Sequence, residues 1–260
     1  MGNFEILKTN YLNTTTLVAV TNGSTTISNL FDRDRSTQFT TVNNTSTGAT
    51  IGIEFLSSRY IDRIVIQNHN LKSFRVYYNS NSANTFTLTN NETTASLWTG
   101  NSDTSTYLTF ATIAVTSVFI DATLTSGASE DDKKIGQVWA CNREFTFADN
   151  PSASDYEAKL KRKRSSHEMS DGGNVTYVFG DTFEAGIKLK YQSGTSRDNF
   201  RDLYDNKSSF VFVPFPTGTS WEGKEIYECN WDGNFLLKPS KNDWKSGGFD
   251  IDFRVKDTSK

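Results

Sequence analysis

The sequence predicts an all-β protein built from two β-sandwich domains, residues 1–140 and residues 141–260. Apolar side chains recur at every second position in many short runs, which is typical of strands with one face on a core and the other in water. Clusters of Asn, Ser, Thr and Gly, which favour turns, separate these runs. Beyond Trp139 the charge density rises, and all four prolines lie at or after Pro151. This change of composition marks the boundary between the domains.

The first domain consists of short alternating strands. They are expected at residues 49–55, 59–68, 73–79, 96–98, 105–110, 117–124 and 135–140. In the first of these, Ile51, Ile53 and Phe55 share one face. Short strands at this spacing indicate a sandwich or a jelly roll.

The second domain continues the alternation and adds one helix. Its strands are expected at residues 155–163, 174–179, 183–191, 208–214, 225–231 and 247–255. Segment 170–174, Ser-Asp-Gly-Gly-Asn, is a turn signal that joins the first two strands into a long hairpin. We expect Ser196 to cap a short helix near 197–205, because Phe200, Leu203 and Tyr204 then fall on one helical face. The domain is therefore predicted to be a sandwich with a helix between two of its strands.

The charge balance argues against a polyanionic partner. The chain has 27 Lys and Arg against 30 Asp and Glu, a formal net charge of −3, so nothing favours a nucleic-acid backbone or an anionic membrane. No stretch approaches the roughly 20 apolar residues that a membrane span requires. The first ten residues lack the apolar run of a signal peptide, so export by the general route is not expected.

The residue pattern does not point to catalysis, and we expect no enzyme. Cys141 and Cys229 are too far apart for a metal-type spacing, and we expect both to be buried thiols. Ser165, Ser166 and His167 are adjacent, but neighbours on a strand point in different directions, so no catalytic triad is implied. A glycosidase needs two carboxylates with no fixed spacing in the sequence, and that alternative stays open.

A basic run, Lys161, Arg162, Lys163 and Arg164, lies in the first strand of the hairpin. On a strand its members alternate between two faces, so only half of them can line one surface. Two interpretations remain. Lysines can protect an exposed edge strand from unwanted pairing, or the run can form an oligomer contact through charge pairs with a neighbouring subunit.

Several motifs of the first domain belong together. They are the Asp-rich turn of residues 29–41, the strands of 49–55, 59–70 and 71–79, and the closing strand of 135–140. In this combination, residues 10–140 resemble the discoidin or coagulation-factor type C family, whose fold is the galactose-binding-like jelly roll. Many members of that family bind sugars or lipid headgroups through loops at one end of the barrel.

The resemblance implies a structural calcium ion at the Asp-rich turn, with oxygen ligands from Asp32, Asp34 and Thr37. Gln137 stands where the family often has a coordinating Glu, which removes one formal charge from the site. In the alternative, Asp32 and Asp34 cap the turn through hydrogen bonds to backbone amides, and no ion binds. No other cofactor is expected.

The best candidate contacts to a ligand of the jelly roll are Asn68, His69 and Asn70, in the loop after the second predicted strand. The candidate tip loops are otherwise rich in Asn and Thr and lack the exposed aromatic side chain on which a sugar ring usually stacks. The alternative is a loop histidine that binds no ligand.

The second domain resembles a different group. The long basic hairpin, the helix before a strand and a Pro turn, and the closing strand at 247–255 are similar to the β-sandwich of tailed-phage tail-tube and distal-tail proteins. This resemblance implies a homo-oligomeric ring that contacts other virion tail proteins, with the long hairpin extending a sheet toward the neighbouring subunit.

Two functions follow as expectations. The first is a structural protein of a bacteriophage tail or tail tip, made in the host cytoplasm and located in the virion, which assembles through the second domain and displays the first. The second is a carbohydrate-binding adhesion or surface-recognition protein whose partner is a cell-surface glycan. Neither function needs nucleic-acid specificity, a membrane span or catalysis.

Overall fold

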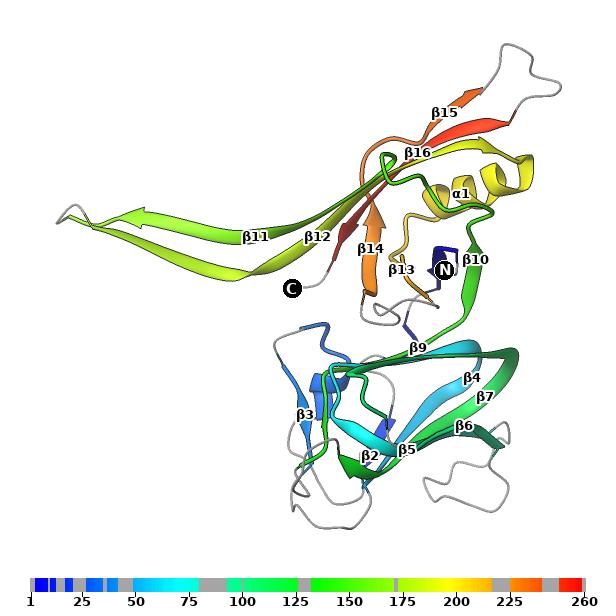
Figure 1. Cartoon of the computed structure of the whole chain (residues 1–260), viewed down its shortest axis with the longest axis vertical. Helices are drawn as coiled ribbons and strands as arrows, with labels where there is room; N and C mark the ends of the chain where they lie inside the picture. Colours follow the sequence, from blue (N-terminus) through cyan, green and yellow to red (C-terminus); the bar gives the residue numbers. More distant parts are fainter. Residues whose placement is uncertain are drawn as a thin grey trace. The chain divides into compact units, whose positions relative to one another are not determined.

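β-strands predominate in the part of the chain that the structure describes (Figure 1). In the computed structural model, the described residues are 3–8, 10–12, 17–20, 27–34, 37–41, 49–79, 93–99, 101–125, 132–170, 173–216, 225–239 and 248–258. Strands make up most of these ranges, and one α-helix lies within them, so the predicted all-β sandwich class is confirmed. None of the helical segments in these ranges has the length and apolar character needed to cross a membrane.

The chain divides into two compact units. Unit 1 consists chiefly of Leu7–Glu144 and Val213–Ile226, and unit 2 consists of Asn3–Ile6, Phe145–Phe212 and Tyr227–Lys260. Residues 3–6 belong to unit 2 and residues 213–226 belong to unit 1, whereas a division at residue 140 would place each of these segments in the other unit. Residues 3–6 belong to unit 2 because strand β1 (Glu5–Leu7) hydrogen-bonds within the sheet of that unit.

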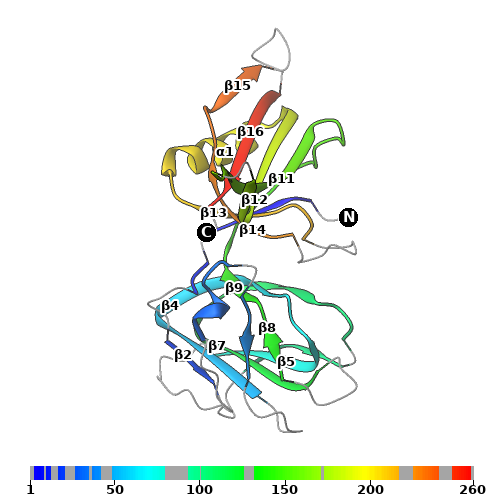
Figure 2. The same cartoon turned by 90° about the vertical axis from the view of Figure 1, so that its left-hand side faces the viewer.

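Unit 1 is an antiparallel β-structure with two sheets. The larger sheet has the order β2 (Leu17–Val20), β4 (Ala49–Gln67), β7 (Ser105–Thr125), β5 (Leu71–Asn79) and β6 (Thr93–Trp98), and β9 (Gln137–Cys141) also pairs with β4. The smaller sheet joins β3 (Phe39–Thr40) to β8 (Lys134–Ile135), side by side in Figure 2. A short 3-10 helix, η1 (Ile27–Leu30), leads into the Asp-rich turn and includes its first two residues.

The core of unit 1 follows from the alternation in β4, β5 and β7. Ile51 of β4 stands opposite Ile120 of β7 and Ile53 opposite Val118, and all four are buried. The two runs predicted at 49–55 and 59–68 form one continuous strand, in which residues 56–60 are exposed and the register with β7 shifts. The interruption in the apolar pattern therefore marks an irregularity in one strand and not a turn between two strands.

Unit 2 is built on one sheet. Its order is β10 (Arg143–Thr146), β1, β13 (Phe210–Val213), β14 (Tyr227–Trp231), β16 (Phe249–Asp257), β12 (Asn174–Gln192) and β11 (Tyr156–Glu168), and β15 (Leu236–Pro239) also pairs with β16. The pairs from β13 to β11 and the pair of β15 with β16 are antiparallel. The inward side chains form an aromatic-rich core that includes Phe183, Phe212 and Phe253. Many of its rings meet edge to face or tilted, the arrangements that aromatic pairs prefer.

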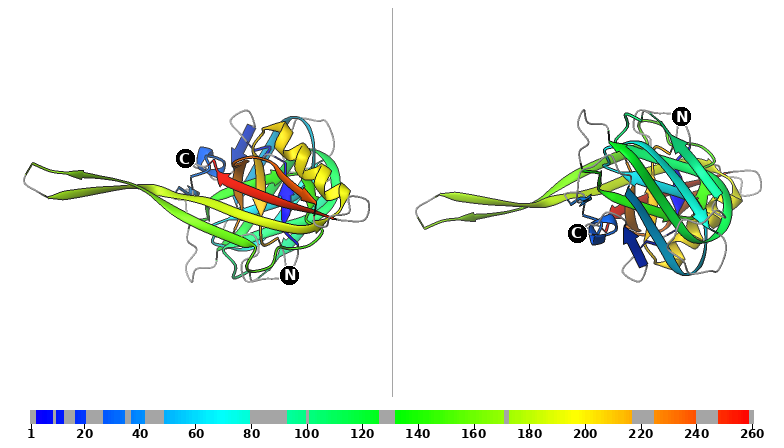
Figure 3. Two further views of the ribbon diagram at one scale, coloured as in Figure 1. Left: turned by 90° about the horizontal axis from the view of Figure 1, so that it is seen from above. Right: turned by 90° about the horizontal axis from the view of Figure 1, so that it is seen from below.

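The helix α1 (Gly194–Asn206) completes this core (Figure 3). As predicted, Phe200 and Leu203 are buried on one face of the helix. The helix starts earlier than predicted, because Ser193 and not Ser196 is the cap: Ser193 Oγ accepts a hydrogen bond from the backbone N–H of Ser196 at 3.2 Å. Lys207, in the left-handed conformation, ends the helix.

Strands β11 and β12 form the predicted hairpin, and its far half projects from the rest of the sheet of unit 2 (Figure 1). Only residues 184–192 of β12 pair with β16, whereas β11 and β12 pair with each other as far as Glu168 and Asn174. We call the projecting part, residues 161–168 and 174–182, the ribbon. Because β11 is the last strand on its side of the described sheet, the ribbon is two strands wide.

Candidate functional site

The Asp-rich turn of unit 1 is held together around the Asp32 carboxylate. Asp32 Oδ1 accepts a hydrogen bond from the backbone N–H of Asp34 at 2.9 Å, and Asp32 Oδ2 accepts one from Thr37 Oγ1 at 2.7 Å. Gln137 Nε2 donates to Asp32 Oδ1 at 2.9 Å and to the Asp34 carbonyl oxygen at 3.3 Å. The three residues predicted as calcium ligands therefore do lie together, joined by a residue from the closing strand.

The amide of Gln137 takes the place at this turn that a cation would take. Both oxygens that it faces are acceptors, so its NH2 group and not its carbonyl oxygen must point toward them. A calcium ion bound to the same two oxygens would meet these amide hydrogens. Within the described ranges, no three His, Cys, Asp or Glu side chains are grouped as metal ligands. In this structure these residues form a hydrogen-bonded turn around Asp32, with the Gln137 amide as its donor, and the calcium ion stays a prediction.

This geometry gives a direct test at Gln137. We expect wild-type protein to melt at the same temperature in calcium and in EDTA. Gln137→Glu replaces two donors with a carboxylate facing Asp32, and should destabilise the protein by about 1–3 kcal/mol in EDTA. Calcium should restore much of that loss, because two carboxylates now share the site. Thermal melts of both proteins in both buffers measure this.

Gln192→Glu is the matched control. Gln192 is also buried, and its Nε2 donates to the Lys190 carbonyl oxygen at 3.1 Å, away from the Asp-rich turn. This variant should lose stability equally in calcium and in EDTA. A wild-type melting temperature that rises in calcium would contradict our assignment of the Gln137 amide.

The loop predicted to contact a ligand, Asn68 to Asn70, is tied to other parts of unit 1. His69 is only 3% exposed. Its Nδ1 accepts from the backbone N–H of Leu71 at 3.2 Å, so Nε2 carries the proton and lies 3.0 Å from Thr106 Oγ1. Burial lowers the pKa of His69 to about 4, against a smaller opposing effect of Asp103. His69 is thus neutral near pH 7 and is not presented to a ligand.

The two flanking asparagines differ in exposure. The Asn70 side chain donates to the Asp132 carbonyl oxygen at 2.8 Å and accepts from the Lys134 backbone N–H at 2.7 Å. Asn68 is exposed and has a positive φ of 53°. Gly136 packs against it so closely that an added Cβ would lie 2.7 Å from Asn68 Cβ, which explains the glycine there. Of the three predicted contacts, Asn68 is exposed, Asn70 is partly exposed and His69 is buried.

The basic run lies where β11 enters the ribbon. Lys161 forms an ion pair with Glu184, while Arg162 and Arg164 are exposed; the Lys163 side chain is outside the described residues. The position on an edge strand agrees with both interpretations, edge protection and subunit contact. Within the ribbon, Ser165 Oγ lies 3.1 Å from His167 Nε2 at the exposed surface. No carboxylate among the described residues orients that imidazole, so this pair differs from a triad.

A further polar group crosses the outer face of the large sheet of unit 1. Thr50, Asp121 and Arg75 stand opposite one another on β4, β7 and β5. Asp121 Oδ2 lies 3.4 Å from an Arg75 terminal nitrogen, and Asp121 Oδ1 accepts from Thr50 Oγ1 at 3.3 Å. The Arg75 guanidinium carbon lies 5.3 Å from the centroid of the half-buried Tyr77 ring. We call these four residues the polar row.

Sequence reasoning missed the polar row, because Arg75 and Asp121 are separated by 46 residues. A signal was available in the alternation itself. Arg75 and Tyr77 alternate with the buried Phe74 and Val76, so their shared outward face follows from the strand period. No pattern in the sequence near Arg75 indicates that β7 is the strand that pairs with β5.

Comparison with known proteins finds likeness in structure only. No family model matches the chain, and no curated protein matches its sequence. The chain is similar to chitosan-binding module 1 of a chitosanase/glucanase from Paenibacillus sp. IK-5 (16% identity, TM-score 0.42, 51% of this chain and 98% of that chain). It is also similar to a family 32 carbohydrate-binding module from Clostridium perfringens in complex with galactose (14% identity, TM-score 0.41, 54% and 99%).

A third similar structure is a GH29 fucosidase from Ruminococcus gnavus in complex with fucose, at 13% identity and a TM-score of 0.43. The match covers 52% of this chain and 27% of the fucosidase chain. The present chain therefore spans about a quarter of that enzyme's length.

Proposed function

We propose that the chain is a carbohydrate-binding protein without catalytic activity, and that unit 1 contacts its glycan through the polar row. The observation that carries the proposal is the pairing of Arg75 with Asp121 on the outer face of the sheet, beside the half-buried Tyr77 ring. The motifs shared with the discoidin family, many of whose members bind sugars, support the same function.

The chemistry of the polar row suits a sugar. Neighbouring hydroxyls of a pyranose each donate and accept a hydrogen bond. A guanidinium offers several donors in one plane, and a carboxylate offers two acceptors, so the Arg75 and Asp121 pair can serve both needs. Asp121 and Tyr77 restrict the Arg75 side chain, which lowers the entropy lost when a ligand is bound. Sites on strands are also held more rigidly than sites on loops.

A glycan array with the full chain, followed by calorimetry on the best glycan, tests the proposal. We expect Arg75→Gln to weaken binding at least about tenfold, because a hydrogen bond to a charged group contributes roughly 1.5–3 kcal/mol. Lys72→Gln, which removes an exposed charge from the same strand β5, should leave affinity unchanged. Equal affinity in wild type and Arg75→Gln would contradict the placement of the site.

The phage-tail function is the second candidate, and the ribbon favours it. A projecting two-stranded hairpin with an edge strand and exposed apolar residues, such as Leu160 beside the ribbon and Tyr177 within it, is a surface on which another subunit can add a strand. A chain that ignores every glycan on the array and forms a ring in light scattering would favour assembly over sugar binding.

A further inference from the structure

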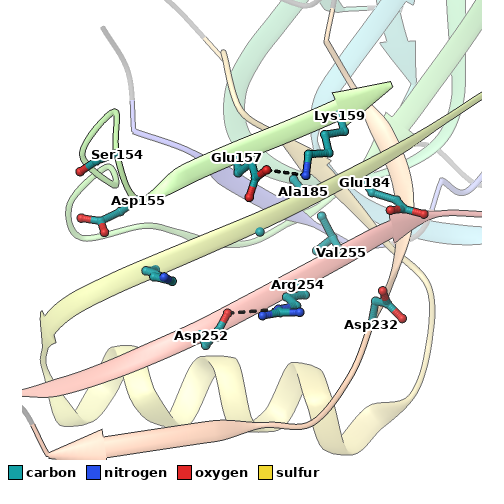
Figure 4. Close-up of a pocket in the computed structure, with 12 residues that line it drawn as sticks. Ser154, Asp155, Glu157, Lys159, Glu184, Ala185, Asp232, Asp252, Arg254 and Val255 are labelled. Carbon is teal, nitrogen blue, oxygen red and sulfur yellow. Dashed lines mark hydrogen bonds and ion pairs between the residues drawn. The ribbon is translucent and has the colours of Figure 1, made fainter. Parts of the chain in front are cut away.

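A hollow of about 280 Å³ opens on the outer face of the unit 2 sheet, over β11, β12 and β16 (Figure 4). Its centre is Gly186 of β12, which stands opposite Glu157 of β11 on one side and Arg254 of β16 on the other. Figure 4 shows Glu157, Glu184, Asp252 and Arg254 among the side chains that line the hollow. With no side chain at Gly186, the peptide backbone forms the floor.

Neither packing nor conformation requires glycine at this position. The residue lies inside a regular strand, and a Cβ added there would meet nothing within 4 Å. Glycine inside a strand costs about 0.5–1 kcal/mol relative to alanine, since it has more freedom to lose on folding and no side chain to pack. Such a glycine often marks a place where a ligand approaches the backbone closely. The open floor is therefore consistent with a binding site.

The rim of the hollow carries charges of both signs, most of them paired. Glu157 forms an ion pair with Lys159, and the Asp252 carboxylate lies 3.5 Å from Arg254 Nε. The Lys159 ammonium also lowers the pKa of the Glu157 carboxyl, which keeps it ionised. A charged ligand gains little from a rim whose charges already neutralise one another.

Two further charged residues line the hollow. They are Lys188 and Asp232, and Lys188 interacts electrostatically with Asp155 and Glu157. The Lys188 ammonium is a donor beside the open floor, and the Asp232 carboxylate is an acceptor there. A neutral molecule with several hydroxyl groups, each both donor and acceptor, matches a rim in which carboxylates alternate with ammonium and guanidinium groups.

From this geometry we propose that the hollow at Gly186 is a binding site for a small neutral saccharide, which lies on the exposed backbone and bonds to Lys188, Asp232 and the Glu157 and Arg254 side chains. The site is in unit 2 and does not depend on the polar row of unit 1. A volume of about 280 Å³ is slightly below the usual range of small-molecule sites, which begins at about 300 Å³, so the hollow suits a ligand of one or two sugar rings.

The test is NMR of the 15N-labelled full chain titrated separately with galactose, N-acetylglucosamine, lactose and chitobiose. At least one of these should shift the amide signals of Gly186, Lys188 and Arg254. Gly186→Trp fills the hollow from its floor, where the space is open, and should weaken that binding at least tenfold. Gly194→Trp is the matched control, because an added Cβ at Gly194 also meets nothing within 4 Å, and it should bind as wild type does.

The results of the NMR titrations either support or overturn the proposed site at Gly186. Shifts around Gly186 that vanish in Gly186→Trp and persist in Gly194→Trp support it. No shift at these amides with any of the four sugars, or equal shifts in Gly186→Trp, overturns it. Shifts at Arg75 and Tyr77 report on the polar row, so the proposed function of unit 1 stands or falls separately from this site.

Discussion

Truncation of Phe200 to alanine should cost the protein about 3–5 kcal/mol, the usual range for a buried phenylalanine. Phe200 is 1% exposed and is the main anchor of α1 in the unit 2 core. Its ring centroid lies 5.0 Å from that of Phe145, 5.1 Å from Phe147 and 5.2 Å from Phe253. Removing the ring leaves a cavity bordered by other rings, which cannot collapse to fill it without leaving their own positions. Urea unfolding followed by tryptophan fluorescence measures the loss, since Trp231 also contacts Phe200.

The control lies on the opposite face of the same helix. Asp202 is exposed, so Asp202→Ala should change the free energy of unfolding by less than about 0.5 kcal/mol. A Phe200→Ala variant within about 1 kcal/mol of wild type would mean that α1 does not close the unit 2 core.

This helix also shows what local pattern can predict. The spacing of Phe200 and Leu203 identified the helix and its buried face, because that information lies within one stretch of chain. The helix cap was predicted at Ser196, three residues after the true cap Ser193. A serine can cap a helix at either position, and the choice depends on the backbone conformation before the helix, which the sequence pattern does not show. The alternating strands of both units were found for the same local reason.

The candidate sites depend on contacts between residues that are far apart in the sequence, which a local pattern does not predict. Gln137 completes the Asp-rich turn across a separation of 105 residues from Asp32. His69, with an asparagine on either side, has the sequence environment of a surface loop, yet its ring is buried because Leu71 and Thr106 satisfy both ring nitrogens. The alternation of apolar and polar residues predicts which face of the sheet a side chain lies on. It does not predict which strand lies next to it and supplies its contacts, because that depends on the fold of the whole unit.

The buried ring of His69 should make the protein sensitive to mild acid. Its pKa is about 4 in the fold and about 6.5 in an unfolded chain, so the unfolded state takes up the proton first as the pH falls. The stability that depends on neutral His69 is therefore complete above pH 6.5 and is lost progressively as the pH falls toward 4. The pKa difference corresponds to a loss of about 3 kcal/mol at order-of-magnitude precision.

His69→Asn removes the titration and keeps the local hydrogen bond. The bond from the Leu71 N–H to His69 Nδ1 spans two residues, the same separation at which an asparagine Oδ1 accepts from the backbone in an Asx-turn. We expect urea unfolding at pH 7.5 and 4.5 to show a decline in wild type that exceeds the decline in His69→Asn by about 2–3 kcal/mol, because the titration of His69 in the fold is not complete at pH 4.5.

Other carboxylates titrate in both proteins, so the difference between the two declines isolates His69. His167→Asn alters the exposed histidine of the ribbon and should keep the full decline of wild type. If wild type and His69→Asn lost stability equally between the two pH values, His69 would have to be as accessible to protons in the fold as in the unfolded chain. That result would support the original prediction that residues Asn68 to Asn70 contact a ligand, because an imidazole accessible to solvent could bind one.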